Sequence, residues 1–434
     1  MRITHYMGNL RRFRKPFFII LLTIILLFQR DVTPYSEVRI IVTPYTFSIE
    51  SWVAKNIISK VFYYIKNGSE QPNQELSKKT SVISQFFEIN RQIKNKKNEL
   101  NRLRIDVQDQ PLQNHDRDSN EIEQILSFEI TQLIRTRTAI QRQVEEILES
   151  SIQSVLEDQG LFWSWKSSEL VFPPVWLRFD EPPFIIISSS RDKIVMLESV
   201  ILRPELCLTQ IQEIERSVLY RDDLSIWIGK IGGLATYPAI IPYSPNPELV
   251  FKTSAHEWFH HYWFFRPLGS GYSRSLEMTT LNETAADIAG NELGVQVMEI
   301  LGFQSEIFSP ILLSTETDPF DFHFEMHLTR LKVEALLEEG KILEAESYME
   351  ERRLVFVSKG YKIRKLNQAY FAFHGTYGEN PSSVSPIAGQ LKLVRSNSSS
   401  LGSFVQLVGG FGNYQEFLEY VEEFIESGCN GEIC

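Results

Sequence analysis

Two stretches of the chain carry apolar residues at helical spacing, and together they predict a helical hairpin. Phe86, Ile89, Ile93, Leu100 and Leu103 form one heptad seam, interrupted at Lys96. A second seam, interrupted at Arg137, continues after the turn-rich "DQPLQNHDRDSN" and contains Leu126, Ile130, Leu133, Ile140, Val144 and Ile147. We predict an antiparallel hairpin over residues 81–158, acting as a spacer or as an arm for homo-oligomer formation. An amphipathic helix over 46–68 precedes it.

The pattern changes after Gly160, where prolines, tryptophans and β-branched runs appear. "PPFIIIS" and "LSIWIGKIGGLATYPAII" predict strands, separated by a helical stretch over roughly 194–220. From about residue 248 the pattern is helical almost to the end. The expected helices are 248–265, 276–301, 321–338, 341–358, 363–373, 386–396 and 413–426. The fold class is therefore α+β, mostly helical.

The N-terminus predicts a membrane anchor. A basic cluster that ends at Lys15 precedes "FFIILLTIILLF" (17–28), twelve residues with only Thr23 polar. No cleavage site of small residues follows, which favours an uncleaved signal anchor; a cleaved signal peptide and a buried helix are the alternatives. The basic cluster is expected to stay in the cytoplasm, so the remainder is expected to be extracytoplasmic.

These patterns give five expected segments. They are a cytoplasmic tip with the signal anchor (1–30), a juxtamembrane helical segment (31–80), the coiled-coil hairpin (81–158), a catalytic core (159–310) and a helical C-terminal subdomain (311–434).

Charge and cysteine content exclude several classes of protein. The chain has 44 basic and 55 acidic residues, a net charge of −11, which argues against nucleic acid as a partner. Three cysteines exclude a disulfide scaffold and a zinc site built from four thiolates. A metal site in this chain would therefore use histidines and carboxylates.

One stretch offers such a site. "HEWFHHYWFF" places His256 and His260 four residues apart, so both imidazoles lie on one helix face, and Glu257 lies beside the first. Zinc requires a third protein ligand. "LNETAADIAGNELG" (281–294) supplies Glu283, and Asp287 one turn later can accept a hydrogen bond from a ligating histidine.

His256-Glu257-x-x-His260 followed by Asn282-Glu283-x-x-x-Asp287 resembles the gluzincin zinc metallopeptidases, especially the thermolysin-like group. The wider stretch is similar to uncharacterised bacterial membrane-anchored zincins. The resemblance covers residues 256–287 and implies a zincin-like catalytic domain that cleaves a peptide or protein substrate. It implies His256, His260 and Glu283 as zinc ligands, Glu257 as the general base for a zinc-activated water, and Asp287 as support for a ligand.

The resemblance also implies a donor for the reaction's oxyanion and an edge strand that holds substrate. "NQAYFAFHGTYG" offers Tyr370 and His374 as the donor, and the choice between them stays open. The segment 232–242 is the candidate edge strand, with Gly232 and Gly233 leaving room for a substrate backbone.

Other titratable residues suggest less. His261 points about 100° away from the ligand face, so we expect it to form a hydrogen bond in helix packing. His323 and His327 lack an identifiable third ligand for a second metal site. Arg330 is expected to form a salt bridge with a nearby glutamate, with substrate binding as the alternative.

The sequence therefore predicts a membrane-anchored zinc metallopeptidase. Two alternatives remain: a non-catalytic envelope scaffold with a vestigial zinc site, and a zinc hydrolase that acts on a non-peptide amide. The substrate, the choice between exo- and endopeptidase and the oligomeric state are left open.

Overall fold

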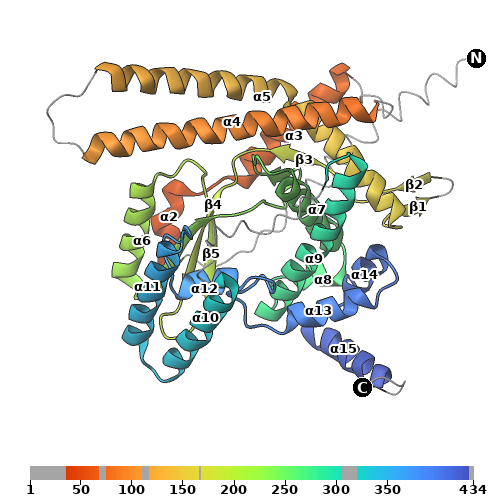
Figure 1. Ribbon diagram of the computed structural model, residues 1–434. Coiled ribbons are helices and arrows are strands. Elements are labelled where there is room, and N and C mark those ends of the chain that lie inside the picture. Colours follow the sequence, from red (N-terminus) through yellow and green to blue (C-terminus); the bar gives the residue numbers. More distant parts are fainter. Residues whose placement is uncertain (1–35, 68–74, 110–116, 166–167, 305–319, 430–434) are drawn as a thin grey trace, which may run out of the picture.

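The chain is mostly helical and contains a small β-sheet, as the computed structural model shows (Figure 1). The structure describes residues 36–67, 75–109, 117–165, 168–304 and 320–429. None of the helices in these ranges is both long enough and apolar enough to cross a membrane. The predicted anchor at residues 17–28 lies outside the described residues.

The N-terminal half contains α2 (Glu37–Val42), the short 3-10 helix η1 (Thr43–Tyr45), α3 (Ile49–Asn67), α4 (Leu76–Asp109), α5 (Arg117–Asp158) and α6 (Leu208–Asp222). The strands are β1 (Trp163–Trp165), β2 (Ser168–Leu170), β3 (Leu177–Phe179), β4 (Phe184–Ser189), β5 (Met196–Leu202), β6 (Ser225–Lys230) and β7 (Ala239–Ile241). The later helices are α7 (Pro247–Phe264), α8 (Pro267–Ser270), α9 (Leu276–Ile300), α10 (Phe322–Glu338), α11 (Ile342–Ser358), α12 (Gln368–His374), α13 (Ile387–Ser396), α14 (Leu401–Val408) and α15 (Tyr414–Cys429).

Helices α4 and α5 form the hairpin that the two heptad seams predict, and it lies along the upper edge of the molecule in Figure 1. The polar residue at each interruption of a seam forms a hydrogen bond with the other helix of the hairpin. Lys96 donates to Glu129 across the hairpin at 2.6 Å, and Arg137 donates to Asn90 at 3.2 Å while its guanidinium covers the Tyr243 ring. The seams are therefore satisfied within one chain.

Helix α5 also binds the edge of β3 through its side chains. The main-chain N–H groups of Leu177 and Phe179 donate to Glu149 and Glu145, at 2.8 and 3.0 Å. Lys60 of α3 forms a buried ion pair with Glu149. These bonds replace the strand neighbour that β3 lacks on this side, and they join the hairpin to the rest of the fold.

A three-stranded antiparallel sheet, in the order β5-β4-β6, lies between two helical layers. Apolar residues of α2 and α6 pack with Ile186 and Ile228 on one face. Helix α12 contributes Ala369 to the other face, where it packs with Trp227 and Ile187. A separate parallel pair, β3-β7, leads directly into α7.

Two predictions about local structure were wrong. Residues 196–202 belong to strand β5 and not to a helix, because β5 pairs with β4 from Met196 to Leu202, with one irregularity in the register. Helix α12 begins at Gln368 and not near 363, because the Asn367 side chain caps it by accepting from the Tyr370 N–H. Helix α14 follows a run of serines and was not predicted. The other helices expected from about residue 248 onward are confirmed within two or three residues at each end.

Candidate metal centre

Helices α7 and α9 pack against each other in antiparallel directions and carry every residue of the H-E-x-x-H and N-E-x-x-x-D motifs. Asn246 caps α7 by accepting from the Glu248 N–H, and Ser275 caps α9 by accepting from the Met278 N–H. Glycines let the two backbones meet. A Cβ atom on Gly290 would lie 2.9 Å from the backbone nitrogen of His256, and one on Gly294 would lie 2.7 Å from the Cα of Lys252.

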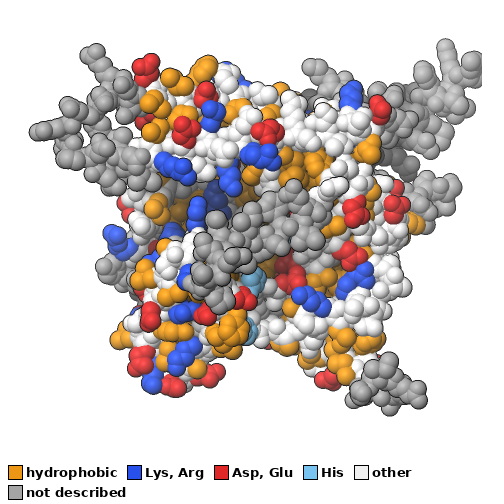
Figure 2. Space-filling model, in the orientation of Figure 1, with side chains coloured by type: hydrophobic (Ala, Val, Ile, Leu, Met, Phe, Trp, Pro, Cys, Tyr) orange, Lys and Arg blue, Asp and Glu red, His pale blue; other side chains and the backbone are white. Residues whose placement is uncertain are grey.

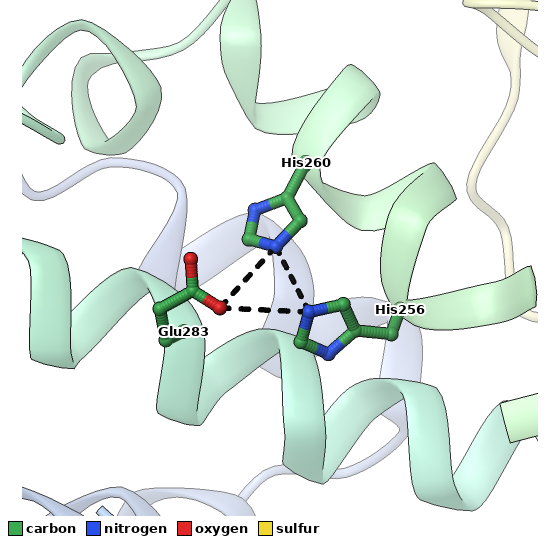
Figure 3. Close-up of side chains that lie close together, drawn as sticks. All are labelled: His256, His260 and Glu283. Carbon is green, nitrogen blue, oxygen red and sulfur yellow. Dashed lines mark hydrogen bonds and ion pairs between the residues drawn. The ribbon is translucent and has the colours of Figure 1, made fainter. Parts of the chain in front are cut away.

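His256, His260 and Glu283 point toward one another from these two helices (Figure 3). The two Nε2 atoms lie 3.0 Å apart, and Glu283 Oε2 lies 3.6 Å from each of them. In the part of the chain that the structure describes, these residues are the one group of three that could hold a metal ion. All three are at least half-buried.

The second nitrogen of each imidazole has its own acceptor. His256 Nδ1 lies 3.0 Å from Asp287 Oδ1, and His260 Nδ1 lies 2.9 Å from Asn282 Oδ1. In neutral imidazoles both Nδ1 atoms therefore carry hydrogen, and both Nε2 lone pairs face Glu283 Oε2. Three acceptor atoms that converge in a buried place repel one another unless a cation lies between them. The donor set fits zinc, which binds imidazole nitrogen and carboxylate oxygen.

The titration behaviour of the cluster reflects this crowding of acceptors. Burial by itself would lower the pKa of His256, but hydrogen bonds to Asp287 and Glu283 raise this pKa well above the ordinary value. Burial would raise the pKa of Glu283, yet the two histidines lower it below the ordinary value. The cluster therefore favours an ionised carboxylate facing a positive charge, whether the charge is a proton or a metal ion.

Glu257 lies beside the cluster, with its side chain against the loop before β7. A Cβ atom on Gly233 would lie 2.3 Å from Glu257 Oε1, so this glycine leaves the space that the carboxylate occupies. Burial raises the pKa of Glu257, although His256 and His260 act in the opposite direction. The segment 232–242 thus contacts the glutamate directly. Within it β7 pairs in parallel with β3, and Leu234 bridges back to Ile240.

Two tyrosines that the sequence analysis did not select lie at the cluster. Tyr272 donates from its hydroxyl to Glu283 Oε1 at 2.5 Å. Burial, together with the charges of Glu283, Asp287 and Glu257, raises the pKa of Tyr377 well above its ordinary value. The loop of Tyr377 is fixed over α9 because the Gly378 N–H donates to Thr284 Oγ1 at 2.9 Å. The sequence signal for Tyr377 was available, since it lies in the same "HGTYG" run as His374.

Tyr370 and His374 lie on α12, where their rings contact the sheet. Both rings pack against Trp227, with centroid distances of 5.8 Å for Tyr370 and 5.1 Å for His374. Burial raises the pKa of Tyr370 to about 12 and lowers the pKa of His374 to about 4. Both rings also contact each other, and Tyr370 interacts with Ser382 and packs against the core of α10 and α11. None of the contacts described for these two residues is with the three converging side chains.

The remaining titratable residues have structural partners. His261 lies 2.8 Å from the Thr236 carbonyl, and burial lowers the pKa of this histidine to about 4. His327 lies 3.2 Å from the Ser383 carbonyl, and no metal-binding group that includes it occurs among the described residues. Arg330 forms the expected salt bridge, with Glu334 at 2.6 Å.

A hollow of about 590 Å³ lies beside α9 on the side turned toward α13, and none of the residues of the metal cluster lines it. It is lined by Lys252, one turn before His256, and by Ile288, which follows Asp287. Its rim carries two ion pairs, Arg395–Glu292 and Lys392–Glu379. Figure 2 shows histidine side chains near the middle of the face turned to the viewer, with acidic and basic side chains over the region of α9 and α13.

No protein-family model, curated protein or solved structure matches this chain. The assignment of a function therefore depends on the motif residues and on the geometry of the cluster.

Proposed function

We propose that this chain is a zinc-dependent hydrolase that cleaves peptide bonds. One observation carries the proposal: three metal-ligand atoms from α7 and α9 converge within 3.0–3.6 Å, while Asp287 and Asn282 orient the imidazoles from behind. His256, His260 and Glu283 would hold the ion. When bound, zinc supplies a Lewis acid that polarises a carbonyl and makes water more acidic.

The chain's own residues supply the remaining chemistry. Glu257 is buried next to the imidazoles and has a raised pKa, which suits a carboxylate that accepts a proton from the attacking water. The same carboxyl group then returns the proton to the nitrogen of the leaving amine. Gly233 contacts Glu257, so a substrate backbone that lies along 232–234 would place its carbonyl near the base.

The oxyanion formed by attack requires a hydrogen-bond donor. Tyr377 is the candidate nearest the cluster, because its hydroxyl is buried near Asp287 and Glu257 and forms a hydrogen bond with Glu283. Tyr370 and His374 remain predictions for this role. Replacing each of the three by phenylalanine and measuring kcat separates them, because only the true donor lowers kcat strongly.

Two features favour a hydrolase over the scaffold alternative. A structural zinc site has no use for a buried carboxylate beside its ligands, and a structural site is closed by four protein ligands. In the described part of the chain the cluster has three such residues. The experiment is cleavage of a peptide library by the purified full-length chain beside a Glu257→Gln variant. Cleavage that Glu257→Gln abolishes supports the proposal, and no cleavage by a zinc-loaded chain contradicts it.

We also propose a location and partners from the sequence. Residues 11–28 would anchor the chain with its N-terminus in the cytoplasm, which would place the metal centre and its peptide or protein substrate outside. The hairpin α4–α5 would be the surface for self-association, although its apolar seam is already satisfied within one chain. Protease protection in membrane vesicles and light scattering test these two proposals.

A further inference from the structure

We propose that Tyr272 is a positioning residue that makes Glu283 bind the ion through one oxygen only. The inference rests on the proposed zinc site. The Tyr272 hydroxyl donates to Glu283 Oε1 at 2.5 Å, and the other oxygen, Oε2, lies 3.6 Å from both His256 Nε2 and His260 Nε2. The two carboxylate oxygens therefore have different partners, and only one faces the histidines.

The turn between α8 and α9 holds Tyr272 in this place. Its main-chain carbonyl accepts from Thr279 Oγ1 at 2.6 Å, which ties the turn to the first turn of α9. Its ring lies edge-on to the His260 ring, with 6.3 Å between centroids. Backbone, ring and hydroxyl are thus each fixed by a separate contact.

The hydroxyl of Tyr272 faces the cluster. The residue as a whole keeps 38% of its surface exposed, but its hydroxyl donates to the carboxylate of Glu283, which is 6% exposed. A hydrogen bond to a buried carboxylate is a strong one, because the acceptor is charged and shielded from solvent.

The consequence is a coordination position that the protein leaves open. A carboxylate that binds through both oxygens would fill two positions around the ion, whereas one held at Oε1 by a hydroxyl fills one. With two imidazoles, the protein then supplies three ligand atoms, which is the number that catalytic zinc sites use. Tyr272 would therefore set the number of protein ligand atoms as well as the orientation of Glu283.

The test is the visible spectrum of the Co²⁺-substituted full-length chain, together with zinc affinity from chelator competition. Tyr272→Phe removes one hydroxyl and keeps the ring. The control is Tyr262→Phe on α7, whose hydroxyl contacts Arg266 and lies away from the cluster. Melting curves check that both variants fold.

We expect strong four-coordinate absorption in the wild type and in Tyr262→Phe, and weaker absorption of higher coordination in Tyr272→Phe. Zinc affinity of Tyr272→Phe should fall about 10-fold or more, as is usual when a partner of a metal ligand is removed. A spectrum and affinity equal to those of the wild type would overturn this inference alone. A wild-type chain that binds neither ion would overturn the proposed function and this inference with it.

Discussion

Adding one methyl group at Gly290 should separate the two helices that carry the metal ligands. The new Cβ would lie 2.9 Å from the backbone nitrogen of His256 and 3.0 Å from both the Cα and the Cβ of that histidine. Ordinary carbon contacts are about 3.5–4.0 Å, so the helices must move apart by roughly 0.5–1 Å. The opposing atoms are backbone atoms or the Cβ attached to them, and no rotamer change can relieve the contact.

The energetic cost follows from two opposing effects. Overpacking of this kind costs about 1–3 kcal/mol, while alanine in place of glycine within a helix returns up to about 1 kcal/mol. The net destabilisation of Gly290→Ala is therefore small, about 0–2 kcal/mol. The effect on the metal centre is larger, because Glu283 on α9 moves relative to His256 on α7. We expect zinc affinity to fall about 10-fold or more, as it does when ligand support is lost.

The assay is zinc competition against a chromophoric chelator, with thermal melting of the metal-free and zinc-loaded chain. Gly389→Ala on α13 is the matched control, since nothing lies within 4 Å of its added Cβ. The control should raise stability by up to about 1 kcal/mol and leave zinc affinity unchanged. If Gly290→Ala behaves like Gly389→Ala in both measurements, the close approach of α7 and α9 is refuted.

Three further predictions concern the base, the hairpin and pH. Gly233→Ala presses on Glu257, so peptide cleavage should fall about 100-fold while zinc content is kept; unchanged kcat would contradict this contact. Lys60→Met leaves Glu149 buried without its partner and should cost about 3–5 kcal/mol in urea unfolding. The double variant Lys60→Met, Glu149→Gln should regain part of the lost stability, because the unpaired charge is then gone. No gain in the double variant would argue against the ion pair. The folded-state pKa of His374 is about 4, below its usual value, so the unfolded chain takes up the proton first. The contribution of His374 to the free energy of unfolding is therefore fully present above about pH 6.5 and is lost as the pH falls toward 4. In melts from pH 7 to 4.5, His374→Phe should lose about 1–2 kcal/mol less stability than the wild type.

Sequence periodicity was sufficient for the long helices and for the residues that they carry. His256 and His260 share a face because four residues make about one helical turn, and the small residues around Glu283 allow α9 to approach α7. The two interruptions of the heptads, Lys96 and Arg137, could not be interpreted from the pattern, because their partners Glu129 and Asn90 lie on the other helix.

Tertiary contacts decided what the pattern left undetermined. Residues 196–202 were predicted to belong to a helical stretch over roughly 194–220, yet pairing with β4 makes this segment a strand. Tyr272 carries no local signal, whereas Tyr377 lies in the same run as His374; the folding of a turn and a loop onto α9 brings both tyrosines to the cluster. Loop residues near a site of this kind are placed by long-range packing that periodicity does not encode.

Zinc content measured by mass spectrometry on the purified full-length chain, beside His260→Ala and Glu257→Gln, tests the central claim most directly. We predict equimolar zinc in the wild type and in Glu257→Gln, and its loss in His260→Ala, because the histidine is a ligand and the glutamate is not. A folded wild-type chain without zinc, or zinc that survives in His260→Ala, would contradict the claim that α7 and α9 build a metal centre.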